Sequence, residues 1–312
     1  MTLNSQTIGM VTIDVEPDSV WHNTQSNSLS NIESLKRFHK LCVKFEIRPT
    51  YLVTYSVVSD KTSCNILESF LAAGNCEIGV HPHYWETPPV SIDDQGQDAW
   101  VGSHYSDEIL EEKLVNLIEI TKSRLVTPVS HRSGRWGMES RQVSLLSKNG
   151  IEIDTSVTPG IDWSVTGAYD YTNFLTTPYY LDSSDFILPG NSPVLEIPCS
   201  IKPGAKLFGL EKKRYASSVL RRLNFNSQWL RPSPDKSPND LLEISKFCIE
   251  NFSFLNLMTH SSEFRSGCSP FWLNEDSIDQ LFLQLQETFT YWNNSGVKSM
   301  TLKEFKQQYN NI

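Results

Sequence analysis

The residues best able to bind a metal ion occur as two pairs, each at the end of an apolar segment. His81 and His83 follow residues 76–80, whose sequence Cys-Glu-Ile-Gly-Val is typical of a buried strand. Because side chains two residues apart on an extended chain share one face, both imidazoles can contact one metal ion. Imidazole is a common ligand of transition metals, but two histidines at this spacing can also bind only solvent or backbone.

Asp14 and Glu16 form the second pair. They end the segment 7–13, which is rich in β-branched and apolar residues and too short for a helix before Pro17. An acidic exit from a strand into a loop would explain one carboxylate. Two carboxylates on one face, at the strand end where parallel sheets usually bind ligands, favour a site. Three or four nitrogen and oxygen ligands with an open position suit a zinc-type Lewis acid that activates water.

Strand and helix patterns alternate along most of the chain. A helix is predicted from Ser30, with Ser30 as its N-cap and Glu33 three residues later, and another begins at Ser106. This β-α-β-α order predicts a parallel sheet with helices outside it. We therefore expect an α/β fold, as one elaborated barrel-like domain. The further segments are predicted helices at 62–73, 140–148, 239–251 and 274–292 and predicted strands at 49–55, 127–132, 151–154 and 252–260.

Composition excludes several classes of protein. The 312 residues are 39% hydrophobic, with eight Trp, eleven Tyr and fifteen Phe, which is ample for a packed core. No stretch approaches the ~20 apolar residues of a membrane span. A net charge of −9 argues against general nucleic-acid binding. Six scattered cysteines without C-x-x-C spacing, and an N-terminal segment 1–6 without a secretory signal, lead us to expect a cytoplasmic protein with reduced thiols.

The alternation fails between residues 162 and 235, where Gly, Pro, Tyr and Ser are frequent and one strand is expected at 194–198. Within this stretch, the segment Lys202–Arg231 carries eight Lys or Arg and one Glu. Such runs are usually solvated surface. The alternative is peripheral contact with anionic lipid head groups at the inner face of the membrane, or with a phosphate-bearing substrate.

Four segments together resemble the polysaccharide deacetylases, the NodB-homology family of carbohydrate esterases. Their sequences are Thr-Ile-Asp-Val-Glu at 12–16, Glu-Ile-Gly-Val-His-Pro-His at 77–83, Arg-Ser-Gly-Arg-Trp-Gly at 132–137 and Leu-Met-Thr-His-Ser-Ser-Glu at 257–263. They occur in the family's order and roughly its spacing. Segments 154–163 and 269–271 look like the same branch of the family. The resemblance covers the chain, 1–312, except an irregular elaboration at about 165–235.

The resemblance implies a distorted (β/α) barrel with seven or so strands. It also implies a divalent metal at the C-terminal ends of those strands. We expect zinc, with cobalt, nickel or manganese as alternatives. The implied reaction is hydrolysis of an N-acetyl or O-acetyl group on a sugar.

Four residues match functional positions of the family directly. Asp14 matches the aspartate that is the usual general base, and Arg132 matches the arginine that orients it. His81 matches the first metal-binding histidine. His260 matches the late histidine that acts as general acid. For Arg132 and His260, a structural ion pair and a core or capping histidine are the alternatives.

Two positions depart from the family pattern. Val15 stands where the family has its metal-binding second aspartate, so that role is assigned to Glu16, which extended geometry turns toward the same metal. Trp85 stands where the family has its second histidine, four residues after the first. His83 is the nearby replacement, which makes Glu16, His81 and His83 the predicted metal ligands.

Four further residues are predicted to bind substrate. Trp85, Trp136 and Trp163 offer flat apolar faces that suit pyranose rings, although large aromatic residues more often belong to the core. Arg135 is assigned to substrate, with a structural ion pair as the alternative.

Three functions remain open at this point. The first is a metal-dependent hydrolase that removes an acetyl group from an amino sugar of a polysaccharide or its lipid- or nucleotide-linked precursor. The second is an amidohydrolase of the same scaffold acting on a cyclic, non-sugar amide. The third is a non-catalytic glycan-binding protein. The aromatic-rich loops favour the first, and the sequence leaves the oligomeric state open.

Overall fold

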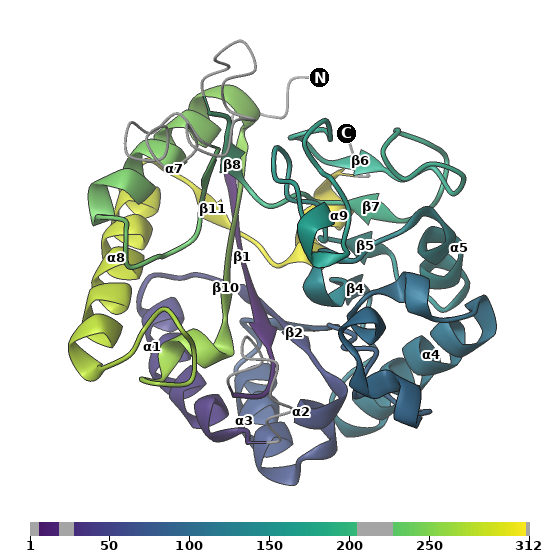
Figure 1. Cartoon of the computed structure of the whole chain (residues 1–312). Helices are drawn as coiled ribbons and strands as arrows, with labels where there is room; N and C mark the ends of the chain where they lie inside the picture. The colour runs from purple at the N-terminus through teal and green to yellow at the C-terminus, as the bar shows by residue number, and fades with distance from the viewer. Residues whose placement is uncertain (1–5, 19–27, 205–226, 310–312) are drawn as a thin grey trace.

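The computed structural model describes residues 6–18, 28–204 and 227–309. Its frame is a curled sheet in which eight of the described strands run parallel (Figure 1). An antiparallel strand, β6 (Tyr179–Tyr180), ends the sheet beside β7, and β11 (Lys298–Ser299) pairs with the start of β1. Besides β11, which is also parallel to β1, the parallel strands in order across the sheet are β10 (Phe254–His260), β1 (Ile8–Val15), β2 (Pro49–Val53), β3 (Glu77–Val80), β4 (Ser130–His131), β5 (Ile153–Asp154) and β7 (Leu195–Glu196).

The chain that follows β7 brings the two sides of this sheet together. The backbone N–H of Ser200 donates to the carbonyl of Asn256 in β10 at 3.0 Å, and the N–H of Asn256 donates to Ser200 Oγ at 2.8 Å. The side chain of Asn256 also donates to the carbonyl of Ile197. These contacts join the far end of the sheet to β10. They confirm the predicted distorted (β/α) barrel with seven or so strands in a single domain.

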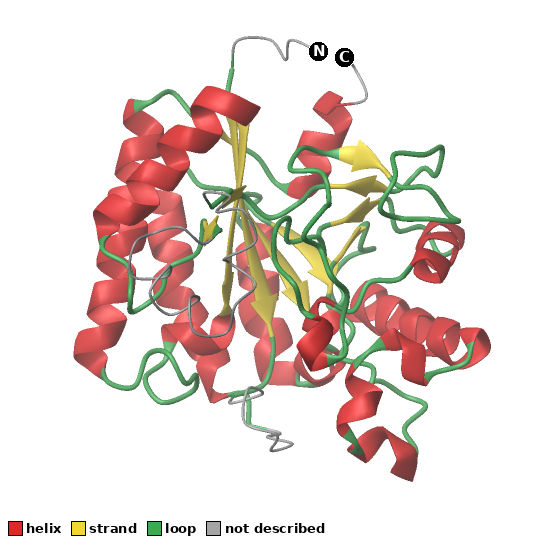
Figure 2. Ribbon diagram, turned by 45° about the horizontal axis from the view of Figure 1, so that its top comes forward, coloured by secondary structure: helices red, strands yellow, loops and turns green. Residues whose placement is uncertain are grey.

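Helices cover the outside of the barrel (Figure 2). Their buried faces are apolar, as in α1 with Leu35, Phe38 and Cys42, because each helix must bury one stripe against the sheet. Beyond several short 3-10 helices, the described helices are α1 (Leu35–Lys44), α2 (Tyr55–Ser59), α3 (Lys61–Ala72), α4 (Asp107–Arg124), α5 (Ser140–Lys148), α7 (Pro238–Phe252), α8 (Glu275–Asn294) and α9 (Leu302–Tyr309).

The prediction that Ser30 caps a helix is wrong. Residues Ser30–Ser34 form a 3-10 helix, and α1 begins only at Leu35. Instead, the backbone N–H and the hydroxyl of Ser30 both donate to the carboxylate of Asp18, at 3.1 and 2.6 Å. Asp18 therefore anchors the chain beyond β1, a tertiary role that the capping pattern alone does not reveal. The cap predicted at Ser106 is confirmed, because its hydroxyl accepts from the N–H of Ile109.

The two faces of β1 have opposite characters. Ile13 and Val15 belong to the apolar core under the helices. Because neighbouring side chains alternate between faces, Thr12 and Asp14 turn into the barrel, where they contact Arg132. This inner face is polar only near the site, since Ile8 and Met10, earlier on the same face of β1, belong to a buried apolar cluster.

The described strands of the predicted elaboration at 165–235 are all two residues long. They include β8 (Ile201–Lys202) and β9 (Gln228–Trp229), which pair with each other in a second, antiparallel sheet. Residues 205–226, and with them most of the basic segment Lys202–Arg231, lie outside the described residues. Across the described parts of the chain, no helix combines the length and hydropathy needed to cross a membrane.

Candidate metal and catalytic site

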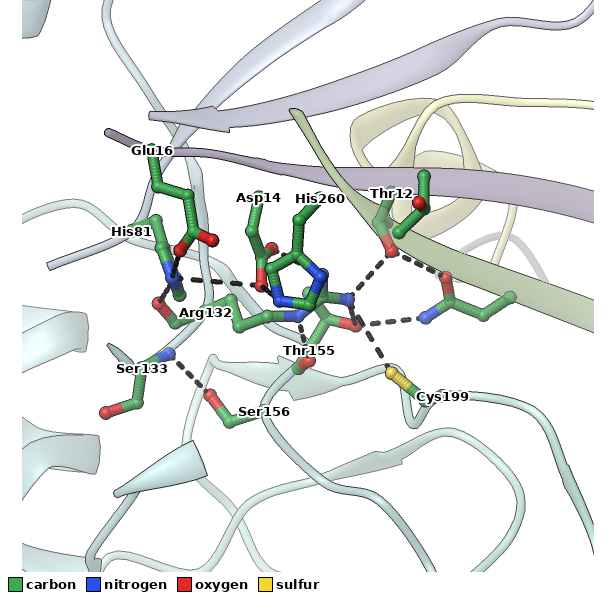
Figure 3. Close-up of polar contacts among 12 residues, drawn as sticks. Thr12, Asp14, Glu16, His81, Arg132, Ser133, Thr155, Ser156, Cys199 and His260 are labelled. Carbon is green, nitrogen blue, oxygen red and sulfur yellow. Dashed lines mark hydrogen bonds and ion pairs between the residues drawn. The ribbon is translucent and has the colours of Figure 1, made fainter. Parts of the chain in front are cut away.

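Four strands deliver the predicted polar residues to one place. Asp14 is the second-last residue of β1, and His260 ends β10 directly opposite it in the pairing register. His81 follows β3, and Arg132 follows β4. Because the carboxyl ends of parallel strands meet at one edge of a sheet, these side chains converge (Figure 3).

His81 has its tautomer fixed by the backbone. Its Nδ1 lies 2.9 Å from the carbonyl oxygen of Arg132, and a carbonyl can only accept, so Nδ1 carries the hydrogen. The lone pair on Nε2 then faces Asp14 Oδ2 at 3.7 Å and Glu16 Oε2 at 3.9 Å. Burial lowers the pKa of His81 to about 3. A neutral imidazole whose single N–H donates to a carbonyl, leaving the other nitrogen free to bind, is the usual state of a metal ligand.

Glu16 and His83 complete a set of donors suited to a metal. Glu16 Oε2 lies 3.4 Å from His83 Nε2, and the candidate ligand atoms of Glu16, His81 and His83 all lie within 4.8 Å of one another. Burial raises the pKa of Glu16 to about 7 and lowers that of His83 to about 4. Glu16 Oε1 is buried without a hydrogen-bond partner among the described residues. This orphaned oxygen beside two neutral imidazoles fits a divalent cation.

Asp14 is held by Arg132 rather than by the histidines. Arg132 NH1 donates to Asp14 Oδ1 at 2.7 Å, and its other nitrogens donate to Thr155 and Thr12. Burial acts to raise the pKa of Asp14, but Arg132, His81 and His260 outweigh it and lower the pKa. Asp14 is therefore ionised at neutral pH, with Oδ2 turned toward the pocket.

His260 closes the site on the side opposite His81. Its Nε2 lies 3.7 Å from Asp14 Oδ2, while its Nδ1 lies 3.3 Å from Arg231 NH2 and 3.5 Å from Glu263 Oε2. Arg231 also forms a 2.7 Å ion pair with Glu263. Burial acts to raise the pKa of Glu263, yet Arg231 and the hydrogen bonds of His260 and Thr259 lower it well below its usual range.

Eight of the ten predicted site residues line one pocket: Asp14, Glu16, His81, His83, Arg135, Trp136, Trp163 and His260. Arg132 lies beneath it, fully buried. Trp85 is absent from the lining and instead stacks on His83, with ring centroids 4.2 Å apart. Trp136 and Trp163 stack on each other at 6.1 Å and form one wall.

Sequence reasoning missed five residues of this site, two of which, Ser133 and Thr166, line the pocket without a further assigned role. Trp100 lines the pocket and carries the guanidinium of Arg135 4.1 Å from its ring centre. Arg231 also lines the pocket, and Glu263 supports His260. Glu263 lies three residues after His260, so the order His-x-x-Glu was an available signal.

The loop after β4 is shaped by its backbone. Gly134 lies so close to the His83 segment that a Cβ there would meet the carbonyl oxygen of Pro82 at 2.5 Å and the His83 ring at 3.0 Å. Arg135 and Trp136 follow with φ of 56° and 59°. Consecutive non-glycine residues in the left-handed region cost on the order of 1–3 kcal/mol each and are concentrated at functional sites. This conformation brings both side chains to the pocket wall.

No protein-family model matches the sequence, and no curated protein matches it. Solved structures do match it in fold. A candidate polysaccharide deacetylase from Mycobacterium smegmatis is 15% identical, with a TM-score of 0.59 over 98% of this chain and 92% of its own. A candidate glycoside hydrolase/deacetylase from Parabacteroides distasonis is 12% identical, with a TM-score of 0.65 over 99% and 72%.

A third structure with this fold has a different activity in its name. The 4-alpha-glucanotransferase from Thermococcus litoralis is 14% identical, with a TM-score of 0.58 over 97% of this chain and 40% of its own. The chain therefore has the fold that these deacetylases share, as the resemblance predicted. Since one fold can carry different reactions, the reaction must be argued from the site.

Proposed function

We propose that this protein is a metal-dependent hydrolase that removes an acetyl group from an amino sugar of a polysaccharide or of its lipid- or nucleotide-linked precursor. One observation carries the proposal: Glu16, His81 and His83 form a buried donor set beside an ionised Asp14 and a histidine, His260. The fold shared with candidate deacetylases supports it.

Glu16, His81 and His83 would hold the metal, with zinc the expected ion and cobalt, nickel or manganese as alternatives. A bound divalent cation supplies Lewis acidity, which polarises a carbonyl and eases the deprotonation of water. His81 is oriented for this task by the Arg132 carbonyl, and Glu16 Oε1 gains the partner that it lacks.

Asp14 acts as the general base in this proposal. Arg132 occupies Oδ1 and keeps the group ionised, so Oδ2 is left to accept the proton of the attacking water. His260 Nε2 faces the same space and protonates the amine that leaves. An amine is a poor leaving group until it receives a proton, so the reaction requires such an acid.

Sugar binding is assigned to the pocket walls. Trp136 and Trp163 present aromatic surface on one side, and Trp100 with Arg135 lies on the wall nearest His83. Aromatic faces pack well against the apolar faces of sugar rings, while Arg135 can donate to hydroxyl or acetyl oxygens.

Metal analysis together with acetate release tests the proposal. The purified protein should contain about one divalent ion per chain and release acetate from N-acetylhexosamine oligosaccharides. His81→Ala should lose both the metal and the activity, whereas His104→Ala, which changes an exposed histidine, should keep both. Acetate release by metal-free protein, or full metal content in His81→Ala, would contradict the proposal. Turnover of cyclic amides but not of acetylated sugars would favour the non-sugar alternative.

A second candidate function is cleavage or transfer of a glycosidic bond. The pKa of Asp14 is lowered and that of Glu16 is raised to about 7, and glycosidases also use two carboxyl groups of unequal acidity. The glucanotransferase with this fold adds support. This function needs no metal, so new reducing ends or transfer products formed by chelator-treated protein would select it.

A further inference from the structure

Lys113 is a fully buried lysine in α4, and its ammonium group lies against the loop that follows His83. Nζ donates to the carbonyl oxygens of Tyr84 and Thr87, both at 2.9 Å, and to that of Pro89. It also lies 3.2 Å from Asp94 Oδ2. A buried charge is costly unless it is paired and hydrogen-bonded, and here three N–H groups meet four acceptors.

A second residue of α4 binds the same loop. Asn116, one helical turn after Lys113, donates from Nδ2 to the carbonyl of Pro88 at 3.0 Å. Together, the two side chains donate hydrogen bonds to the backbone carbonyls of residues 84, 87, 88 and 89. This stretch contains no helix or strand, and buried backbone carbonyls require donors. The conformation of the loop is therefore set from α4.

This loop determines where His83 lies. The carbonyl of His83 accepts from the N–H and the hydroxyl of Thr87, at 3.1 and 2.8 Å, and the carbonyl of Thr87 is held by Lys113. In contrast to His81, His83 has an Nδ1 that is buried without a hydrogen-bond partner among the described residues. Its ring is kept in place by its backbone, by the stacked ring of Trp85 and by the close approach of Gly134.

We propose that Lys113 is the positioning residue for His83. It replaces, through the loop backbone, the ring hydrogen bond that orients most metal-binding histidines. The inference rests on the proposed metal site and adds a residue 30 positions away along the chain, on the outer helix layer. Lys113 touches neither the metal ligands' side chains nor the pocket.

The test compares Lys113→Met with Lys306→Met. Lys306 is also a buried lysine that donates to a carboxylate and a carbonyl, those of Glu152 and Pro193, but it lies in α9. The measured quantity is the Kd for Co²⁺, followed by absorption, and for Zn²⁺, followed by chelator competition. Lys113→Met should raise the Kd values for Co²⁺ and Zn²⁺ by about 10- to 100-fold, as loss of an outer-shell partner typically does. Lys306→Met should leave both within about twofold of wild type.

Hydrogen exchange supplies a readout that needs no metal. In Lys113→Met the amides of residues 82–94 should exchange faster, while Lys306→Met leaves them unchanged. Unchanged metal affinity and unchanged exchange in a folded Lys113→Met would overturn the inference. A wild-type protein that binds no metal would contradict the proposed function. The hydrogen-exchange comparison alone would then test whether Lys113 holds the loop after His83.

If Lys113→Met does not fold, Asn116→Ala decides. This variant removes only the donor to the carbonyl of Pro88. It should raise the Kd for the metal several-fold and speed hydrogen exchange in the same loop. Normal values for both in Asn116→Ala would overturn the inference.

Discussion

Arg132 donates to Asp14 at 2.7 Å, and this contact separates the behaviour of two carboxylates that lie two residues apart. Asp14, beside the guanidinium, has its pKa lowered. Glu16, beside two neutral imidazoles, has its pKa raised by burial to about 7. In the proposed mechanism, the same strand end would present one group that accepts a proton from water and one that exchanges its proton for a cation.

The two carboxylates should respond differently to conversion into amides. Asp14→Asn should keep metal affinity and lose turnover by roughly 10²–10⁴-fold, because the amide cannot take a proton. Glu16→Gln should lose metal affinity by at least about tenfold, with activity restored in part by excess metal. Metal titration and single-turnover assays of both variants measure this. The reverse result, an empty site in Asp14→Asn and a filled one in Glu16→Gln, would exchange the two roles.

Metal affinity should depend on pH through Glu16. Below its pKa of about 7 the carboxyl group is protonated, and the cation must displace that proton. The Kd should therefore rise about tenfold for each pH unit below 7 and become flat above it. His81 and His83, with pKa values lowered to about 3 and 4, do not compete in this range. Calorimetry in buffers of different ionisation enthalpy gives the protons released, and a flat Kd between pH 5.5 and 7 would refute the assignment.

Loss of the His260 side chain should lower the turnover rate but leave metal affinity unchanged. His260→Ala should keep the metal Kd and lose kcat by roughly 10²–10⁴-fold on amide substrates. Esters, whose alcohol leaves with less need of a proton, should lose less. Parallel assays on N-acetyl and O-acetyl substrates measure the difference. Equal losses on both would remove His260 from the role of general acid.

The two tryptophans at different places in the site should separate sugar binding from metal binding. Trp163→Ala removes pocket wall and should raise KM about 3- to 10-fold with little change in kcat or metal Kd, the range of one aromatic contact. Trp85→Ala removes the ring stacked on His83 and should instead raise the Kd for the metal. If Trp85→Ala changes KM and leaves the metal Kd unchanged, Trp85 contacts the substrate, as the sequence predicted.

The sequence predicted the residues that stand on strand ends and missed those that reach the site from loops. Asp14, Glu16, His81 and His83 were accessible because a period of two on a strand fixes which side chains share a face. Trp100 and Arg231 belong to segments without any period, and their approach to the pocket depends on packing between distant parts of the chain. The prediction of Ser30 as a helix cap was wrong for a similar reason, since its backbone N–H and hydroxyl donate to the carboxylate of Asp18.

The supporting contacts were equally hidden. The spacing of α4 places Lys113 on the buried face, three residues after Leu110 and four before Leu117. It does not reveal the backbone carbonyls, 24–29 residues earlier, that Lys113 binds. Backbone acceptors have no signature in the sequence. A polar residue at a buried helix position becomes interpretable only when the loop beneath it is placed.

Arg132 also ties the site to the completeness of the barrel. Its guanidinium contacts Asp14 and Thr12 of β1, Thr155 beyond β5 and Cys199 beyond β7, while its own backbone continues β4. Cys199 immediately precedes Ser200, whose N–H binds β10. Asp14 and Arg132 both lie in the first half of the chain, but the guanidinium completes its contacts only when the segment after β7, from the second half, has joined the barrel. A nascent chain that ends before β7 therefore contains both Asp14 and Arg132, but it lacks the Cys199 contact of the Arg132 guanidinium.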